Sequence, residues 1–412
     1  MTLPRSPLAP GAFPEMPSVP GVRMATAACG VRYPGRPDVV LFELAAGAAM
    51  AGVFTRSATA AAPVLWCRHA LQQSGGRGRA VLVNAGNANA FTGRRGELAV
   101  NETVAAVAEA LGCEVESVYP ASTGVIGEPL PSERITGNVP GLAGHLSSAG
   151  WADAADAIRT TDTFAKGAAR TVRVEGVDVT LAGIAKGSGM IQPDMATMLS
   201  FVFTDANLEP AALQALLEDA NDRTFNCITV DGDTSTSDTV LLAATGQAGH
   251  MAIADPMDER LAEFREALLD LMRDLAQQVV RDGEGAQRFV TIRVSGARDR
   301  LSARRIGFAI ANSPLVKTAV AGRDPNWGRI VMAVGKAGEP ANRDRLAIAI
   351  GGIEIARAGE PVPDYDETPV QQHMAGREID IAVDVGVGDG SATVWTCDLT
   401  HGYVDINADY RS

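Results

Sequence analysis

Several short segments of this chain alternate apolar and polar side chains with a period of two residues. Valines at 172, 174, 177 and 179 flank Gly176, and the same alternation returns at 290–294, 346–350 and 379–385. This period predicts strands with one buried face, and Gly176 predicts a hairpin turn. Since strands outnumber helices and occur partly in hairpins, we expect mixed or antiparallel sheets with helices outside them, rather than a singly wound parallel sheet.

Other segments complete the expected layout. Short apolar runs predict further strands within 38–66 and 79–84, and apolar residues at helical spacing predict helices at 97–111, 211–222 and about 257–280. Pro210 opens the second of these helices, and Gly112 ends the first. The loop at 357–367, with one glycine and two prolines, is the best candidate for a break between structural units.

Composition limits the function. The 412 residues include 36 Lys+Arg and 49 Asp+Glu, a net charge of −13 that disfavours nucleic acid and anionic membranes as partners. Five scattered cysteines form no CxxC pair, which is typical of buried thiols in a reducing compartment. The N-terminal segment does not have the pattern of a secretory signal. No part of the sequence has an apolar run long enough to span a membrane. We expect a soluble cytoplasmic protein of one or two lobes.

The most distinctive stretch is 183–199, in which three glycines and a proline precede Thr197 and an apolar segment. A threonine hydroxyl needs a base, and a free α-amino group on the same residue can be that base. The hypothesis requires cleavage of the Ala196–Thr197 bond, with Thr197 attacking the Ala196 carbonyl. From these residues alone, a glycine-rich turn that enters a buried strand is the more economical interpretation.

A set of separated motifs resembles the ornithine acetyltransferases, the glutamate N-acetyltransferases of arginine biosynthesis. The resemblance covers essentially the whole chain and keeps the order of the family. The matching motifs are Asn84–Ala90, Ser122–Gly127, Thr160–Thr163, Lys186–Leu199, Asp282–Gly285, Asn312–Thr318, Asp324–Arg329 and Tyr410.

The resemblance implies an α+β fold: an αββα sandwich of the N-terminal-nucleophile type with a smaller additional α/β lobe. It also implies autocatalytic cleavage into an α chain, 1–196, and a β chain, 197–412, which fold together and usually assemble as α2β2. Thr197 would be the nucleophile, and Thr123 with Gly124 would form the oxyanion hole, where a hydroxyl and a backbone N–H meet developing negative charge.

The implied reaction moves an acetyl group from N-acetylornithine to glutamate by a ping-pong cycle, giving ornithine and N-acetylglutamate without a metal or organic cofactor. The resemblance leaves open whether acetyl-CoA is a second donor, and whether Thr160 or Thr161 contacts the substrate. Lys186 suits a carboxylate, and Glu284 suits the ammonium of ornithine. The implied substrate contacts are Thr160, Lys186, Thr197, Glu284, Asn407 and Ser412.

Two alternatives remain at this point. An autoprocessed aminopeptidase or amidase of the same fold would pass the acyl group to water, and an inactive scaffold would lack the Ala196–Thr197 junction, which this chain keeps.

The acidic run 231–238 is better explained as a hydrogen-bonded turn than as a calcium loop, because it lacks the Glu position and the length of an EF-hand. We interpret 386–390 as a hairpin turn, since no helix pattern follows its glycines.

Overall fold

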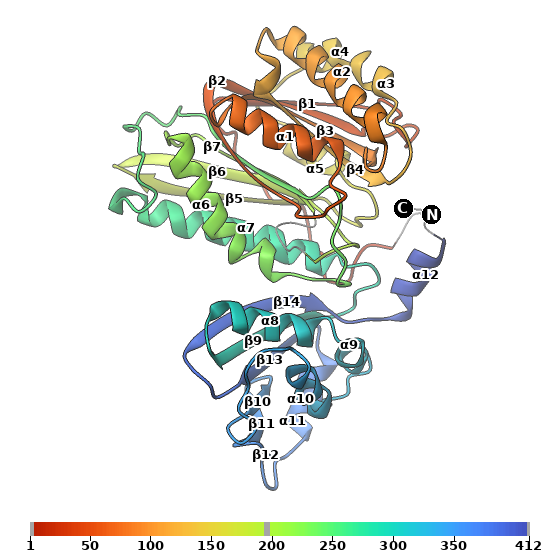
Figure 1. Ribbon diagram of the computed structural model, residues 1–412, viewed down its shortest axis with the longest axis vertical. Helices are drawn as coiled ribbons and strands as arrows, with labels where there is room; N and C mark the ends of the chain where they lie inside the picture. Colours follow the sequence, from red (N-terminus) through yellow and green to blue (C-terminus); the bar gives the residue numbers. More distant parts are fainter. Residues whose placement is uncertain (1–3, 193–197, 410–412) are drawn as a thin grey trace.

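The computed structural model describes residues 4–192 and 198–409 of the chain (Figure 1). Its strands are β1 Val22–Ala27, β2 Val39–Phe54, β3 Arg77–Asn87, β4 Val118–Val125, β5 Lys166–Val174, β6 Val177–Lys186, β7 Leu199–Thr204, β8 Thr239–Ala244, β9 Phe289–Ala297, β10 Ala347–Ile350, β11 Ile353–Arg357, β12 Glu360–Pro361, β13 Glu378–Asp384 and β14 Gly390–Cys397. Its helices are α1 Ala62–Gln73, α2 Gly93–Leu111, α3 Ser132–Thr136, α4 Val139–Gly144, α5 Trp151–Ala157, α6 Pro210–Asp222, α7 Ala262–Arg281, α8 Arg300–Ala311, α9 Pro314–Ala321, α10 Trp327–Gly335, α11 Thr368–Ala375 and α12 His401–Asp409.

The larger lobe contains a mixed sheet in the order β4-β3-β2-β8-β7-β6-β5, with β1 added on β2. The long strand β2 belongs to two layers. Residues 39–43 pair with β3, residues 49–54 pair with β8, and the register against β3 shifts between Glu43 and Ala48. This irregularity lets one strand turn from one layer into the other.

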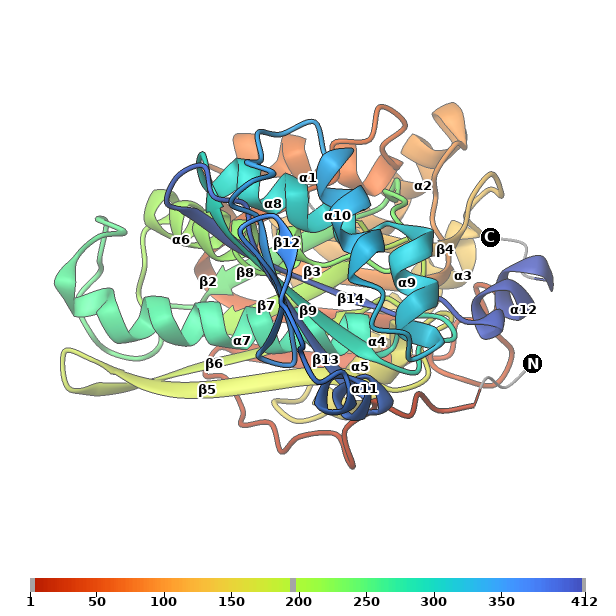
Figure 2. The same ribbon diagram turned by 90° about the horizontal axis from the view of Figure 1, so that it is seen from below.

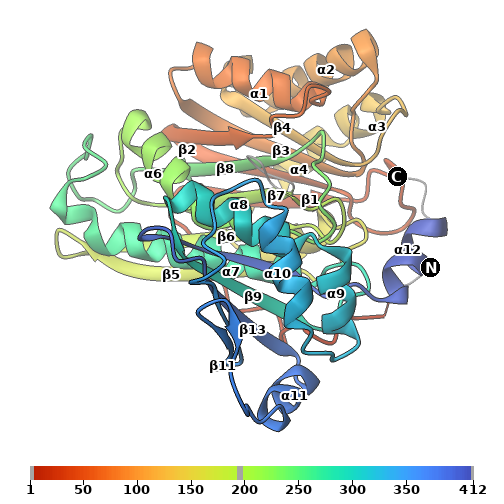
Figure 3. The ribbon, with the colours of Figure 1, turned by 60° about the horizontal axis from the view of Figure 1, so that its bottom comes forward.

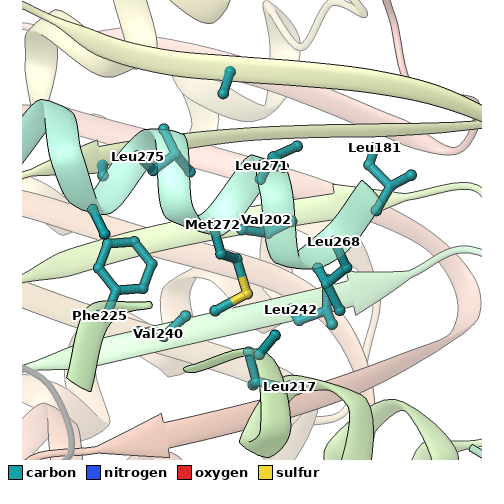
Figure 4. Packing of buried hydrophobic residues seen from close by; sticks show 14 of the residues in the cluster. Leu181, Val202, Leu217, Phe225, Val240, Leu242, Leu268, Leu271, Met272 and Leu275 are labelled. Atoms are coloured by element: carbon teal, nitrogen blue, oxygen red, sulfur yellow. The ribbon is translucent and has the colours of Figure 1, made fainter. Parts of the chain in front are cut away.

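Aromatic rings fill the space between the two β layers. Phe42 of β2 lies 6.1 Å from Phe201 and 4.8 Å from Phe203 of β7, measured between ring centroids. The intervening Val202 points the other way, into a core that includes Leu271 and Leu275 of α7 (Figure 4). Because alternate residues of a strand face opposite sides, β7 is covered by a sheet on one face and by helices on the other.

The remaining outer face is covered by α2, whose apolar residues pack on β2, β3 and β4. The layers are therefore α2, the β2–β4 layer, the β5–β8 layer, and α6 with α7. Figure 2 shows the long β5–β6 hairpin running beside α7. The predicted αββα sandwich is confirmed.

The smaller lobe is a six-stranded sheet in the order β12-β11-β10-β13-β9-β14, in which only the β13–β9 pair is parallel. Helices α8, α9 and α10 gather on the same side of this sheet (Figure 3). The two cores meet at the start of β9, where Phe289 belongs to the larger lobe and Val290 to the smaller. The predicted break at 357–367 is wrong, because that loop joins β11 to β12 and leads to α11 inside the smaller lobe.

Two other local predictions need correction. The apolar run at 62–66 begins α1 rather than ending a strand, because Pro63 stands in the first turn, where a helix does not need its N–H. The glycine turn at 386–390 is not a hairpin, since β13 and β14 do not pair with each other but lie on either side of β9. Among the described residues, no helix is long and apolar enough to cross a membrane.

Candidate functional site

A cavity of about 120 Å³ opens in the larger lobe, where β4 and β6 end and α12 returns from the smaller lobe. The described residues of its wall combine hydroxyl groups, one ammonium group, two carboxyl groups and several apolar side chains. The lining residues used below are Thr123, Gly124, Thr160, Thr161, Lys186, Met198, Ser235, Asp238, Glu284 and Asn407. A few polar groups that converge among apolar side chains are typical of a small-molecule site.

Lys186, the last residue of β6, supplies the cation. Its Nζ donates hydrogen bonds to Thr123 Oγ1 at 3.1 Å and to Thr160 Oγ1 at 2.9 Å. Burial lowers the pKa of Lys186 from its ordinary value, and the nearby carboxyl groups only partly oppose this effect. Thr161 is occupied differently, because its hydroxyl lies 2.6 Å from Ser188 Oγ. Of the two threonines, Thr160 is therefore the one tied to Lys186.

Thr123 and Gly124 lie near the end of β4, in the parallel pair of β3 with β4. Since Lys186 donates to the Thr123 hydroxyl, that hydroxyl keeps its own proton to donate elsewhere. Gly124 has φ = +131°, and a Cβ there would stand 2.3 Å from the carbonyl carbon of Gly86. The close approach of two strands at this point requires glycine.

Glu284 brings an acidic group to the cavity from the turn that follows α7. Its Oε2 accepts a hydrogen bond from Asn407 Nδ2 at 2.7 Å, and its backbone N–H donates to Ser188 O at 3.0 Å. Burial raises the pKa of Glu284, against the hydrogen bonds that favour its charge. Asn407 lies on α12, which the Thr400 hydroxyl anchors to Gly285 O at 2.7 Å. Helix α12 is therefore held against the cavity by hydrogen bonds of Thr400 and Asn407.

A fully buried charge cluster, which the sequence analysis missed, supports this wall. Lys166 Nζ lies 2.7 Å from Asp162 Oδ1 and 2.6 Å from Asp282 Oδ2, and all three side chains are inaccessible to solvent. Asp162 also accepts hydrogen bonds from the backbone N–H of Gly187 at 2.6 Å and of Thr160 at 3.0 Å. Asp162 thus fixes the backbone on both sides of the Lys186 ammonium, which lies 4.0 Å from its Oδ2.

The structure brings six predicted site positions together in the cavity wall: Thr123, Gly124, Thr160, Lys186, Glu284 and Asn407. Ala196, Thr197 and Ser412 lie outside the described residues. Met198, the residue that follows Thr197 in the sequence, lines the cavity. Asp238, which also lines it, was missed as an individual residue, although the acidic run 231–238 that contains it was noticed.

An ammonium group and a carboxyl group in one small cavity, with hydroxyls between them, define a site for a small molecule that carries both charges. The chain matches the ArgJ family over residues 23–412. It is 58% identical to the arginine biosynthesis bifunctional protein ArgJ of Ruegeria pomeroyi over 99% of this chain and 98% of that protein. It is 56% identical to the protein of the same name from Gluconobacter oxydans, over 100% of this chain and 96% of that one.

A crystal structure of the arginine biosynthesis bifunctional protein ArgJ from Bacillus halodurans is 42% identical, with a TM-score of 0.50 over 52% of this chain and 100% of that one. The chain belongs to the ArgJ family. This membership confirms the prediction of an acetyltransferase in arginine biosynthesis and does not favour the amidase alternative.

Proposed function

We propose that this protein transfers an acetyl group from N-acetylornithine to glutamate through an acetyl ester on Thr197. The observation that carries the proposal is that Lys186, Glu284 and Thr123 line the same cavity as Met198. Lys186 anchors the α-carboxylate that both substrates share, and Glu284 faces the side-chain ammonium of ornithine. The proposal also includes substrate contacts by Asn407 and Ser412, and a contact by Thr160 rather than Thr161.

Thr197 becomes a nucleophile when the Ala196–Thr197 bond is cut, because its new α-amino group then serves as base. Thr123 and Gly124 stabilise the oxyanion of each tetrahedral intermediate. The Thr123 hydroxyl suits this role because it accepts from Lys186 and retains a proton to donate. No cofactor takes part in these steps. The relatives are named bifunctional, which favours acetyl-CoA as a second acetyl donor for glutamate.

The fragments 1–196 and 197–412 remain together in this proposal and pair as α2β2. All five cysteines lie within the described residues and are unpaired, which supports a reducing compartment such as the cytoplasm.

The first test is the intact mass of the purified protein, with sequencing of new N-termini. We expect two fragments whose masses sum to the 42.9 kDa chain plus one water, one of them beginning Thr197-Met198-Leu199. An active preparation that consists of one uncut chain would refute the mechanism. Acetyl transfer is then assayed with acetylornithine and glutamate, and release of acetate without glutamate would favour the amidase.

A further inference from the structure

Asp238 is a buried carboxyl group in the cavity wall that the proposed cycle has not yet used. It directly precedes β8, and its carbonyl accepts the Thr55 N–H at 3.0 Å. The next residue, Thr239, donates its N–H to Met198 O at 3.0 Å. The side chain of Asp238 is therefore held at the place where β7 begins, and only 2% of its surface is exposed.

One oxygen of this carboxyl group lacks a partner among the described residues. Within the described part of the chain, Asp238 Oδ2 makes no hydrogen bond, although the atom is fully buried. A buried polar atom without a partner is unfavourable, and Asp238 lines the cavity, so this carboxyl group is free to exchange a proton with a group that binds beside it. The other cavity-lining carboxyl group of the described residues, Glu284, already accepts from Asn407.

The environment of Asp238 favours its protonated form. Burial raises the pKa of Asp238 well above its usual range, while Ser235, Thr55 and the Lys186 ammonium act in the opposite direction with smaller effect. A shift in this direction favours the protonated carboxyl group, which can give up its proton when a basic nitrogen approaches. The resulting carboxylate would be stabilised by Lys186.

The proposed acetyl transfer needs a second proton carrier. The amide nitrogen of acetylornithine must gain two protons before ornithine leaves as an ammonium ion. The α-amino group of Thr197 relays one, which comes from its own hydroxyl. Glutamate then arrives with its α-amino group as an ammonium ion, and this nitrogen must lose two protons to become an amide. Only one of these protons returns to the Thr197 oxygen. The first half-reaction therefore lacks one proton, and the second releases one.

We propose that Asp238 is the catalytic residue that carries this second proton, an inference that rests on the proposed acetyl transfer. In the first half-reaction the C–N bond of the tetrahedral intermediate breaks, and Asp238 gives its proton to the leaving amine and becomes a carboxylate. In the second, the carboxylate takes a proton from the ammonium of glutamate, and the freed amine attacks the acetyl ester. Asp238 ends the cycle protonated, as it began.

The experiment compares Asp238→Asn with the wild type, using substrates that do and do not need this proton. p-Nitrophenyl acetate acetylates the enzyme and releases a phenolate that leaves without protonation, whereas acetylornithine requires it. Hydroxylamine attacks the acetyl ester as a neutral amine, whereas glutamate must first be deprotonated. Asp233→Asn is the matched control, because it makes the same change in the same loop at an exposed residue.

We expect Asp238→Asn to slow transfer from acetylornithine to glutamate by at least about 100-fold. Acetylation by p-nitrophenyl acetate and deacetylation by hydroxylamine should stay within about threefold of the wild type, as should every reaction of Asp233→Asn. Each rate is divided by the amplitude of the p-nitrophenol burst. This amplitude gives the number of competent active sites when only part of the protein has matured. Asp238→Glu, which keeps a carboxyl group, should recover part of the transfer.

Equal losses on all four substrates would assign Asp238 a structural role and overturn the inference. Normal transfer between acetylornithine and glutamate in Asp238→Asn, or no recovery in Asp238→Glu after division by the burst, would also overturn it. Failure of the underlying function has a different signature: the wild type would then carry no acetyl group on the peptide that begins with Thr197 after treatment with p-nitrophenyl acetate.

Discussion

Replacing Lys166 with methionine tests whether the buried charge cluster stabilises the larger lobe. The variant leaves Asp162 and Asp282 buried without the ammonium that lies 2.7 and 2.6 Å from their oxygens. Removing one partner of a buried ion pair costs about 3–5 kcal/mol of unfolding free energy. With a urea m-value of about 3 kcal/mol/M, the unfolding midpoint should fall by about 1 to 2 M.

Arg170→Met is the matched control, because Arg170 lies on the same strand and also pairs with two carboxylates, Asp270 and Asp274. Its side chain is 31% exposed, so the loss should be about 1 kcal/mol or less. Urea unfolding is followed by circular dichroism at one protein concentration, since fragment association would make the midpoint depend on concentration.

The loss of unfolding free energy in Lys166→Met should also depend on pH. Burial would raise the pKa of Asp162, but Lys166, Lys186 and hydrogen bonds outweigh it and hold this pKa below its usual range. The wild type therefore keeps this stabilisation above the unfolded pKa of about 3.9 and loses it as the pH falls further. In the variant, burial raises the pKa values of both carboxyl groups, so acid restores stability. The deficit should shrink from about pH 7 to about pH 4. A deficit no larger than that of Arg170→Met, or one independent of pH, would refute the reasoning.

Three further predictions concern single residues. Thr123→Ala should lower kcat for acetyl transfer on the order of 100-fold through loss of an oxyanion donor, and unchanged turnover would remove Thr123 from the mechanism. Gly124→Ala should lower the melting temperature measured by calorimetry, because its Cβ would meet Gly86 at 2.3 Å; an unchanged value would show that the strands can separate there. Cys113 should react first with a thiol reagent, as peptide masses would show, because the other four cysteines are buried and burial raises the pKa of Cys29 to about 12. Faster labelling of any other cysteine would contradict this.

Elements with local signals could be predicted from the sequence. The predicted helix 211–222 corresponds to α6, Pro210–Asp222, and the predicted end at Gly112 is the left-handed cap of α2. These signals act within one turn of a helix, so they can be recognised without knowledge of the rest of the fold. By contrast, α1 was mistaken for strand because its short apolar run fits both structures, and neighbouring layers decide between them.

The candidate site depended on family resemblance, because its contacts join residues far apart in the sequence. Lys186 meets Thr123 across 63 positions, and Lys166 meets Asp282 across 116. No spacing rule predicts such pairs. Asp238 was missed for another reason: an aspartate in a polar run of serines and threonines is usually exposed, and here the two-layer packing buries it.

The order of strands in the larger sheet explains how the proposed cleavage could leave the fold intact. Cutting before Thr197 would separate β6 from β7 in the chain, yet these two strands are antiparallel neighbours in the sheet. The second fragment would contribute β7 and β8, which lie between β2 and β6 of the first fragment. Both boundaries, β2 with β8 and β6 with β7, would then be pairings between fragments. Separation would break these two strand pairings and divide the aromatic core of Phe42 and Phe203, so we expect the fragments to stay together after cleavage.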